Sequence, residues 1–128
     1  MKKEIISTDK APRAIGPYSQ AMKVGDFIFV SGQLPIEPST GKLIGNDIRD
    51  QTKQSLENLK AILEASDYSM DEVVKVTVFL KYMDDFEEMN EIYGQYFTHK
   101  YPARCCVEAS KIPKDARIEI EAIAHSRA

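Results

Sequence analysis

Arg104 is the side chain in this sequence with the most distinctive potential chemistry, because it begins a short strand-like run just after a proline. An arginine keeps its positive charge in a protein, and its flat fork of N–H donors matches a carboxylate at two points. A charge that leads into an apolar strand needs an anionic partner or a path to water. The residue alone leaves two interpretations open, an internal salt bridge and a site for a small carboxylate ligand.

Four further residues could complete a site around Arg104. Asn90 is expected on the inner side of a helix, where an amide needs hydrogen-bond partners. Ser31 and Gly32 end a predicted strand, and the glycine would let a ligand approach the backbone closely. Tyr18 follows a stiff Gly-Pro pair that would hold its phenol in place. Each also has a plain structural interpretation, as a loop contact, a strand-ending turn or a half-buried aromatic.

Two residues near the end of the chain could take part in a reaction directly. Glu119 shares one face of the last predicted strand with Glu121, and a carboxylate in a cleft can position or deprotonate water. The alternative is a charged outer face of the sheet. Cys106 could act as a nucleophile, but no base is recognisably placed to activate it, so we interpret it as lining or packing.

Length and composition limit the class of protein. The chain of 128 residues predicts one domain, residues 1–128, with enough hydrophobic residues (43%) for a real core. The net charge is −3, and the basic residues are spread thinly, which counts against a nucleic-acid surface. No spacing of His, Cys, Asp or Glu indicates a metal site, and no glycine-rich phosphate loop is present, so we expect neither metal nor cofactor.

The sequence shows no recognisable targeting signal. The first residues lack the apolar stretch of a signal peptide, and no segment is long enough to cross a membrane. The two cysteines, Cys105 and Cys106, are adjacent, an arrangement that rarely forms a disulfide. We therefore expect a reduced, cytoplasmic protein with no membrane partner.

Hydrophobic periodicity predicts strands, a helix, a strand, a second helix and then two strands. The first helix should run over residues 47–65 with Asn46 as a plausible cap, and the second should begin at Asp84 or Asp85. In the strand between them, Val74 is expected on the same face as the apolar residues 76, 78 and 80. This order fits an α+β sandwich with both helices on one face of a mixed sheet. The opposite face is partly apolar, so we expect it to be buried in part against another subunit.

Several segments together resemble the Rid family (YjgF-type proteins). They are residues 14–20, 30–35, 85–93, 101–107 and 111–124, which follow one another along nearly the whole chain. The resemblance implies a chorismate-mutase-like α+β fold and a homotrimer with clefts between subunits. It also implies hydrolytic deamination of reactive 2-enamines and 2-imino acids, such as 2-aminoacrylate, 2-iminobutanoate and 2-iminopropanoate. The products would be 2-oxo acids and ammonia.

The same resemblance assigns roles to the candidate residues. By position, Arg104 would bind the substrate carboxylate, and Glu119 would handle the water. The remaining contacts to the small 2-imino or 2-oxo acid ligand would come from Tyr18, Ser31, Gly32, Asn90 and Cys106.

Other functions remain open from the sequence. The same arginine cleft could belong to a non-enzymatic module that binds a small carboxylate as a signal. An RNA-cleaving inhibitor of translation is a second alternative, against which the acidic balance and the scarcity of histidines both count. No residue pattern indicates a chaperone-like surface, and chorismate mutase chemistry would call for more cationic groups.

Overall fold

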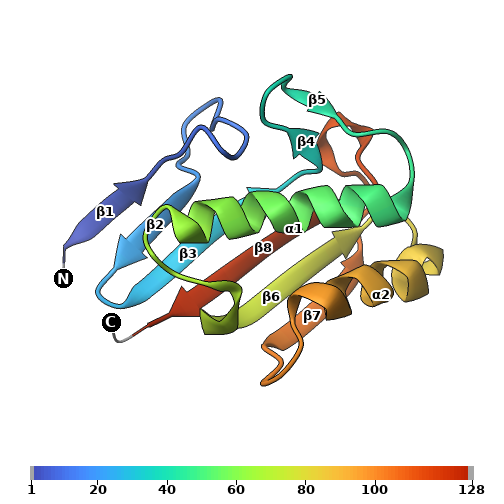
Figure 1. Ribbon diagram of the computed structural model, residues 1–128. Coiled ribbons are helices and arrows are strands. Elements are labelled where there is room, and N and C mark those ends of the chain that lie inside the picture. Colours follow the sequence, from blue (N-terminus) through green and yellow to red (C-terminus); the bar gives the residue numbers. More distant parts are fainter. Residues whose placement is uncertain (1, 127–128) are drawn as a thin grey trace.

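The computed structural model describes residues 2–126 and contains a six-stranded sheet with two helices across one face (Figure 1). The strand order is β1-β2-β3-β8-β6-β7. Strands β6 and β7 pair in parallel, and the other neighbours in this sheet are antiparallel. The strands of this sheet are β1 (Lys3–Ile6), β2 (Ala21–Val24), β3 (Phe27–Gln33), β6 (Val73–Leu80), β7 (Ala103–Glu108) and β8 (Ile118–His125).

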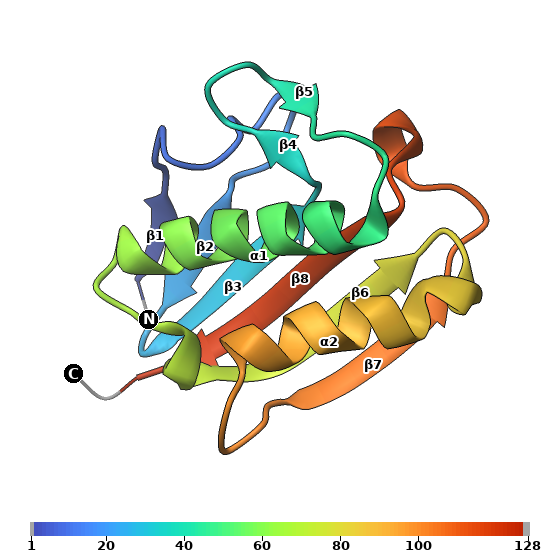
Figure 2. The ribbon, with the colours of Figure 1, turned by 45° about the vertical axis from the view of Figure 1, so that its right-hand side comes forward.

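The two helices lie side by side over the same face of the sheet (Figure 2). They are α1 (Ile48–Glu64) and α2 (Phe86–Tyr96). Single turns of 3₁₀ helix, η1 (Met70–Glu72), η2 (Met83–Asp85) and η3 (Pro113–Asp115), join the larger elements. This arrangement confirms the predicted α+β architecture, with a mixed sheet and both helices on one side.

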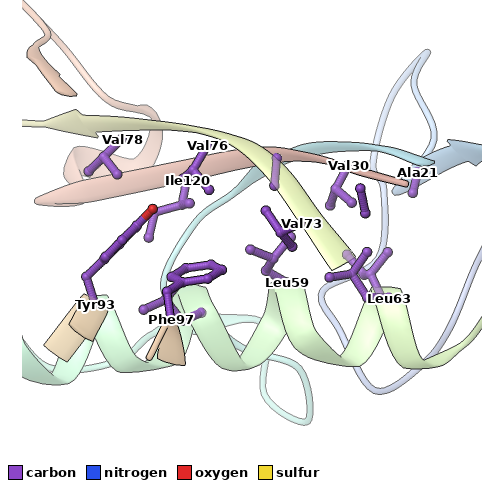
Figure 3. Close-up of a cluster of buried hydrophobic side chains, with 14 of the residues drawn as sticks. Ala21, Val30, Leu59, Leu63, Val73, Val76, Val78, Tyr93, Phe97 and Ile120 are labelled. Carbon is purple, nitrogen blue, oxygen red and sulfur yellow. The ribbon is translucent and has the colours of Figure 1, made fainter. Parts of the chain in front are cut away.

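The core fills the space between the helices and the sheet. Figure 3 shows Tyr93 of α2 pointing toward Val78 and Ile120 of the sheet, and Leu59 and Leu63 of α1 pointing toward the part of the sheet that contains Val73 and Val30. Helical spacing in the sequence predicts one apolar stripe on the first helix, and all of its residues are buried in α1: Ile48, Leu56, Leu59, Ile62 and Leu63. Full burial of one such aliphatic side chain is worth about 1.5–3 kcal/mol, so this stripe fixes the helix on the sheet.

The prediction for the start of β6 is wrong by one residue. Val73 is 4% exposed and Val74 is 44% exposed, the reverse of what strict alternation from Val76 requires. The pairing of β6 with β8 shifts register between Val73 and Lys75. A bulge inserts one extra residue into a strand and turns the residues before it to the other face.

The cap residue of α1 differs from the prediction, whereas α2 begins where it was predicted to, with Asp85 at its N-cap. Asp47, not Asn46, caps α1, because its carboxylate accepts a hydrogen bond from the Arg49 N–H at 2.7 Å. Asp85 lies at the N-cap position of α2 but makes no capping bond with its side chain. Its carboxylate instead binds Arg117 through Nε and Nη2 at 2.8–3.2 Å.

Two predicted loop and strand boundaries change as well. The segment expected as a loop between residues 32 and 46 contains a small hairpin of β4 (Ile36–Glu37) and β5 (Lys42–Leu43). The hydrophobic pattern predicts a strand over residues 18–24, but Tyr18 lies in a loop, because β2 begins only at Ala21. The side chain of Gln20, 4% exposed, holds that loop by donating to the carbonyls of Thr8, Ala11 and Pro12.

The sheet face opposite the helices carries exposed apolar side chains. Phe27 and Phe29 of β3 are 44% and 45% exposed, and Val107 of β7 is 38% exposed. This agrees with the partly apolar open face expected from the sequence. Its burial against another subunit stays a prediction.

Candidate active site

Arg104 lies on β7 and points to the helix side of the sheet. Its guanidinium carbon is 4.7 Å from the ring centre of Tyr93 and 5.4 Å from that of Phe86, both on α2. The Nη1 group donates to Asn90 Oδ1 at 2.7 Å. Aromatic faces attract cations electrostatically, so α2 supplies a seat that holds the guanidinium at a fixed place.

The partner of Arg104 within the chain is a neutral amide. None of the ion pairs among residues 2–126 includes this arginine. Asn90 is exposed and not buried on the inner side of α2, so the prediction of an inward-facing amide is wrong. The guanidinium keeps its full positive charge toward solvent, as a site for an external carboxylate requires.

An open cavity of about 550 Å³ borders this arginine. We call it the Arg104 cavity, and it is lined by Asn90, Tyr93, Gly94, Tyr101, Pro102 and Arg104. Tyr93 is a residue of this candidate site that sequence analysis missed, because helical periodicity predicts it only as one of the buried apolar residues of the second helix. Its spacing of three residues from Asn90 puts both on one side of the helix, and this spacing could have revealed it.

Glu119 lies elsewhere, in a larger open cavity of about 730 Å³. We call it the Glu119 cavity. Of the predicted site residues, it brings together Tyr18, Ser31, Gly32 and Glu119. Four of the seven candidates from the sequence therefore share one cavity, and Asn90 and Arg104 share the other.

Gly32 is required by the close approach of Glu119. A Cβ atom at position 32 would lie 2.5 Å from Glu119 Oε2 and 2.8 Å from its Cδ. The carboxylate therefore rests directly on the backbone of β3. Any side chain at position 32 would push it from this place.

The environment of Glu119 changes its acidity. Burial raises the pKa of its carboxyl above the ordinary value, and the nearby charge of Glu121 raises the pKa further. A carboxylate with a raised pKa is a stronger base toward water. Glu119 is half-buried, so it can still reach solvent in the cavity.

Ser31 and Tyr18 occupy the same wall. The Ser31 hydroxyl donates to the Ser19 carbonyl at 2.6 Å, which leaves its oxygen free to accept from a ligand. Tyr18 is 55% exposed, and its N–H donates to the Gly16 carbonyl at 2.9 Å. The tight turn thus holds the phenol at the cavity rim.

Cys106 is two residues from Arg104 on β7 and packs in part against the core. Burial raises the pKa of its thiol, and the charge of Arg104 lowers it. The side chain is not among those that line the Arg104 cavity. A thiol with a raised pKa is a poor nucleophile at neutral pH, so its geometry fits packing beside the arginine.

Arg104 and Glu119 point to opposite faces of the sheet. Arg104 is paired with Val76, whose side chain is in the core under the helices. Glu119 is paired with Phe79, and its neighbours Ile118 and Ile120 are in the core, so Glu119 points away from the helices. One copy of the chain cannot bring the two charges together around a small molecule.

Within residues 2–126, no group of three or more His, Cys, Asp and Glu side chains could hold a metal ion. No helix in this part of the chain is long and apolar enough to span a bilayer. Both cysteines are free thiols.

The comparisons with known proteins agree with the fold. Residues 8–126 match the family model described as endoribonuclease L-PSP. A RutC family protein of Pyrococcus horikoshii is 59% identical over 123 residues, which cover 96% of this chain and 98% of that protein. The α+β fold and the shared sequence therefore define an L-PSP domain.

Two further relatives specify the family. A structure from Yersinia pestis, described as a member of the conserved Rid protein family, superposes with a TM-score of 0.95 at 44% identity and covers 98% of this chain and 100% of that one. TdcF of Escherichia coli, provisionally named a reactive intermediate deaminase, is 47% identical over 125 residues, or 95% of this chain and 96% of TdcF. A crystal structure of TdcF with bound serine has a TM-score of 0.92. The chain belongs to the Rid (YjgF-type) family.

Proposed function

We propose that this protein hydrolyses reactive 2-enamines and 2-imino acids to 2-oxo acids and ammonia. The proposal depends on the guanidinium of Arg104. It lies against the rings of Tyr93 and Phe86, and its hydrogen-bond partner inside the chain is the neutral side-chain amide of Asn90. Such a guanidinium fits the carboxylate that all 2-imino acids share. The relative named a reactive intermediate deaminase supports this reaction class.

The proposed active site is built by two copies of the chain. Because Arg104 and Glu119 lie on opposite faces of one sheet, a neighbouring copy must bring its Glu119 cavity to the Arg104 cavity of the first. A closed ring of identical contacts generates one cleft per subunit, and a homotrimer is the assembly we propose. The exposed Phe27, Phe29 and Val107 on the open sheet face offer apolar surface for that contact.

The chemistry follows from these two charges. Arg104 binds the carboxylate and so fixes the C=N carbon near the neighbouring copy's Glu119. Glu119 accepts a proton from water as the oxygen adds to that carbon, which gives a tetrahedral carbinolamine. Glu119 gives that proton to the nitrogen and then transfers the hydroxyl proton of the carbinolamine to the nitrogen as well, so that the C–N bond breaks, ammonia leaves and the C=O bond forms. An enamine enters the same route after it takes a proton on carbon and becomes the imine.

Roles for the other predicted residues are part of the proposal. Tyr18 and Ser31 would bond the ligand from the Glu119 side, and Gly32 would line the cleft there. Asn90 would hold Arg104, and Cys106 would pack beside that arginine. The scheme needs no cofactor. Two free cysteines suit a reducing compartment, and we propose that the protein is cytoplasmic.

The test is a coupled assay in which a threonine dehydratase releases 2-iminobutanoate and 2-oxo acid formation is followed. Arg104→Ala should remove the acceleration given by the wild type. Arg49→Ala is the matched control, because Arg49 is a half-exposed arginine that pairs with Glu88 and Glu91, and none of these three residues lines either cavity. Full acceleration by Arg104→Ala, with the assembly intact by light scattering, would refute the carboxylate clamp.

Measurements on the same protein sample can distinguish two alternative functions. Binding of 2-oxobutanoate without faster imine decay would favour a non-enzymatic ligand-binding module, and the serine in the TdcF structure shows that a relative binds a small amino acid. The family model is described as an endoribonuclease, so RNA is a second arm of the test. We expect no cleavage, because His99 and His125 contact Thr98 and Phe27 and lie outside both cavities.

A further inference from the structure

The turn η3 contributes Pro113 and Lys114 to the lining of the Glu119 cavity, and it contains two consecutive residues with left-handed backbone. Lys114 has a φ of 60° and Asp115 a φ of 59°, and both follow Pro113 in the turn η3. Residues with a side chain avoid this region, because the Cβ atom is crowded there. Such strain persists where surrounding contacts enforce it, and it is concentrated at functional sites.

Asp115 supplies the contacts that enforce the turn. Its Oδ1 forms an ion pair of 2.7 Å with Lys81 Nζ, and Asp115 raises the pKa of that lysine. The Lys81 N–H in turn donates to the Arg117 carbonyl at 2.9 Å, at the entry to β8. The turn is therefore tied to the strand that carries Glu119.

Lys114 has no comparable role inside the chain. Its residue lines the Glu119 cavity, and it is absent from the ion pairs formed within residues 2–126. Arg13, on another wall of the same cavity, is likewise absent from them. The cavity thus contains two cations that pair with neither Glu119 nor Glu121, so both cations stay available to an external anion.

We propose that Lys114 is a specificity-determining residue that binds a second anionic group, at the side-chain end of a 2-imino or 2-oxo acid. This inference rests on the proposed function, in which Arg104 of a neighbouring copy binds the first carboxylate. Lys114 would then favour dicarboxylate ligands over monocarboxylates of the same chain length. Arg13 would add a second positive charge, which with Lys114 balances the two carboxylates of Glu119 and Glu121 in the same lining.

The apolar part of the cavity cannot provide this discrimination. Ile15 and Leu34 also line it, and apolar walls distinguish ligands that differ by a methylene only weakly. A cation at this place in the cavity lining can distinguish a charged side-chain end from a neutral one, because only the charged end gains an ion pair.

The experiment measures equilibrium binding of two product-like ligands, 2-oxopentanoate and 2-oxopentanedioate, by titration calorimetry on the assembled protein. The wild type should bind the dicarboxylate more tightly. Lys114→Gln should lower the ratio of the two affinities about two- to fivefold, as expected for loss of an exposed ion pair. Lys111→Gln removes a nearby exposed lysine outside the cavity and should leave the ratio unchanged.

A pair of glycine variants excludes a merely structural role. Lys114→Gly keeps the left-handed turn and removes the charge, so the ratio should fall as it does in Lys114→Gln while the denaturant midpoint stays the same or rises. Lys100, with a φ of 49°, is another left-handed lysine outside both cavities. Lys100→Gly should give the same relief of strain without any change in the ratio.

The proposal is overturned if the wild type shows no preference, if neither ligand binds, or if Lys114→Gln weakens both ligands equally. Equal weakening would mean that Lys114 contacts the first carboxylate. Binding is measured without turnover, so a failed imine assay beside a ratio that depends on Lys114 would refute the proposed reaction and leave the second anion site standing.

Discussion

The Arg104 cavity and the Glu119 cavity differ in how each holds its charged group. Arg104 rests on aromatic rings and a neutral amide, so its charge stays available to a ligand. Glu119 is pressed against the backbone at Gly32, and both burial and Glu121 raise its pKa. The first arrangement suits binding of an anion and the second suits abstraction of a proton. The comparison indicates that affinity and turnover can be changed separately.

Glu119→Gln should have the largest effect on turnover. The amide keeps the shape and loses the base, so imine hydrolysis should fall by about 10²–10⁴-fold, the usual range for a general base. Binding of 2-oxobutanoate at Arg104 should persist, because the carboxylate contact is untouched. Turnover at the wild-type rate would mean that another group activates the water. The division of roles, with binding at Arg104 and proton abstraction at Glu119, would then be wrong.

Gly32→Ala should have the second-largest effect on turnover. The added methyl would sit within 3.0 Å of three Glu119 side-chain atoms and displace the carboxylate. A displacement near 1 Å can lower the rate about 10²-fold. Single-turnover kinetics would show this as a loss in kcat with little change in ligand binding. A variant with unchanged kcat would show that Glu119 does not need its place against β3.

Variants of Tyr93 test ligand binding at the Arg104 cavity, where we expect a smaller effect. Tyr93→Leu removes the aromatic seat under Arg104, which is worth about 0.5–2 kcal/mol, so the dissociation constant for 2-oxobutanoate should rise about 2- to 30-fold. Tyr93→Phe keeps the ring and should bind nearly as the wild type does. It also removes a buried hydroxyl that has no hydrogen-bond partner, so its stability should not fall.

If Tyr93→Phe weakened binding as much as Tyr93→Leu did, the hydroxyl and not the ring face would be responsible. That hydroxyl is buried, and burial raises the pKa of Tyr93 to about 12, so it stays neutral over the working pH range.

The sequence predicted the layers of the fold better than its details. Alternation and helical spacing placed the apolar stripes of α1 and β8 correctly, because burial dictates both patterns. The bulge at Val73 was missed, since it arises from pairing with β8, which a single strand does not encode. Asn46 and Asp47 can both cap a helix, and only tertiary contacts decide between them.

The candidate site shows the same limit. Family-specific segments identified the residues, and four of them share one cavity. Their division between two sheet faces was not predicted, because it depends on the parallel register of β7 with β6. The seat formed by Tyr93 was missed for a related reason. A residue in an apolar stripe is predicted to be part of the core. Its aromatic ring can nevertheless pack in the core and bind a cation at the same time.

The opposed placement of Arg104 and Glu119 also has a genetic consequence. If each cleft takes its arginine from one copy and its glutamate from the next, two inactive variants can complement each other when they are co-assembled. Random mixing of equal amounts of Arg104→Ala and Glu119→Gln chains would give about a quarter of the clefts an intact pair. Activity recovered from such heterotypic rings, and from neither parent alone, would show that neighbouring chains share each reaction.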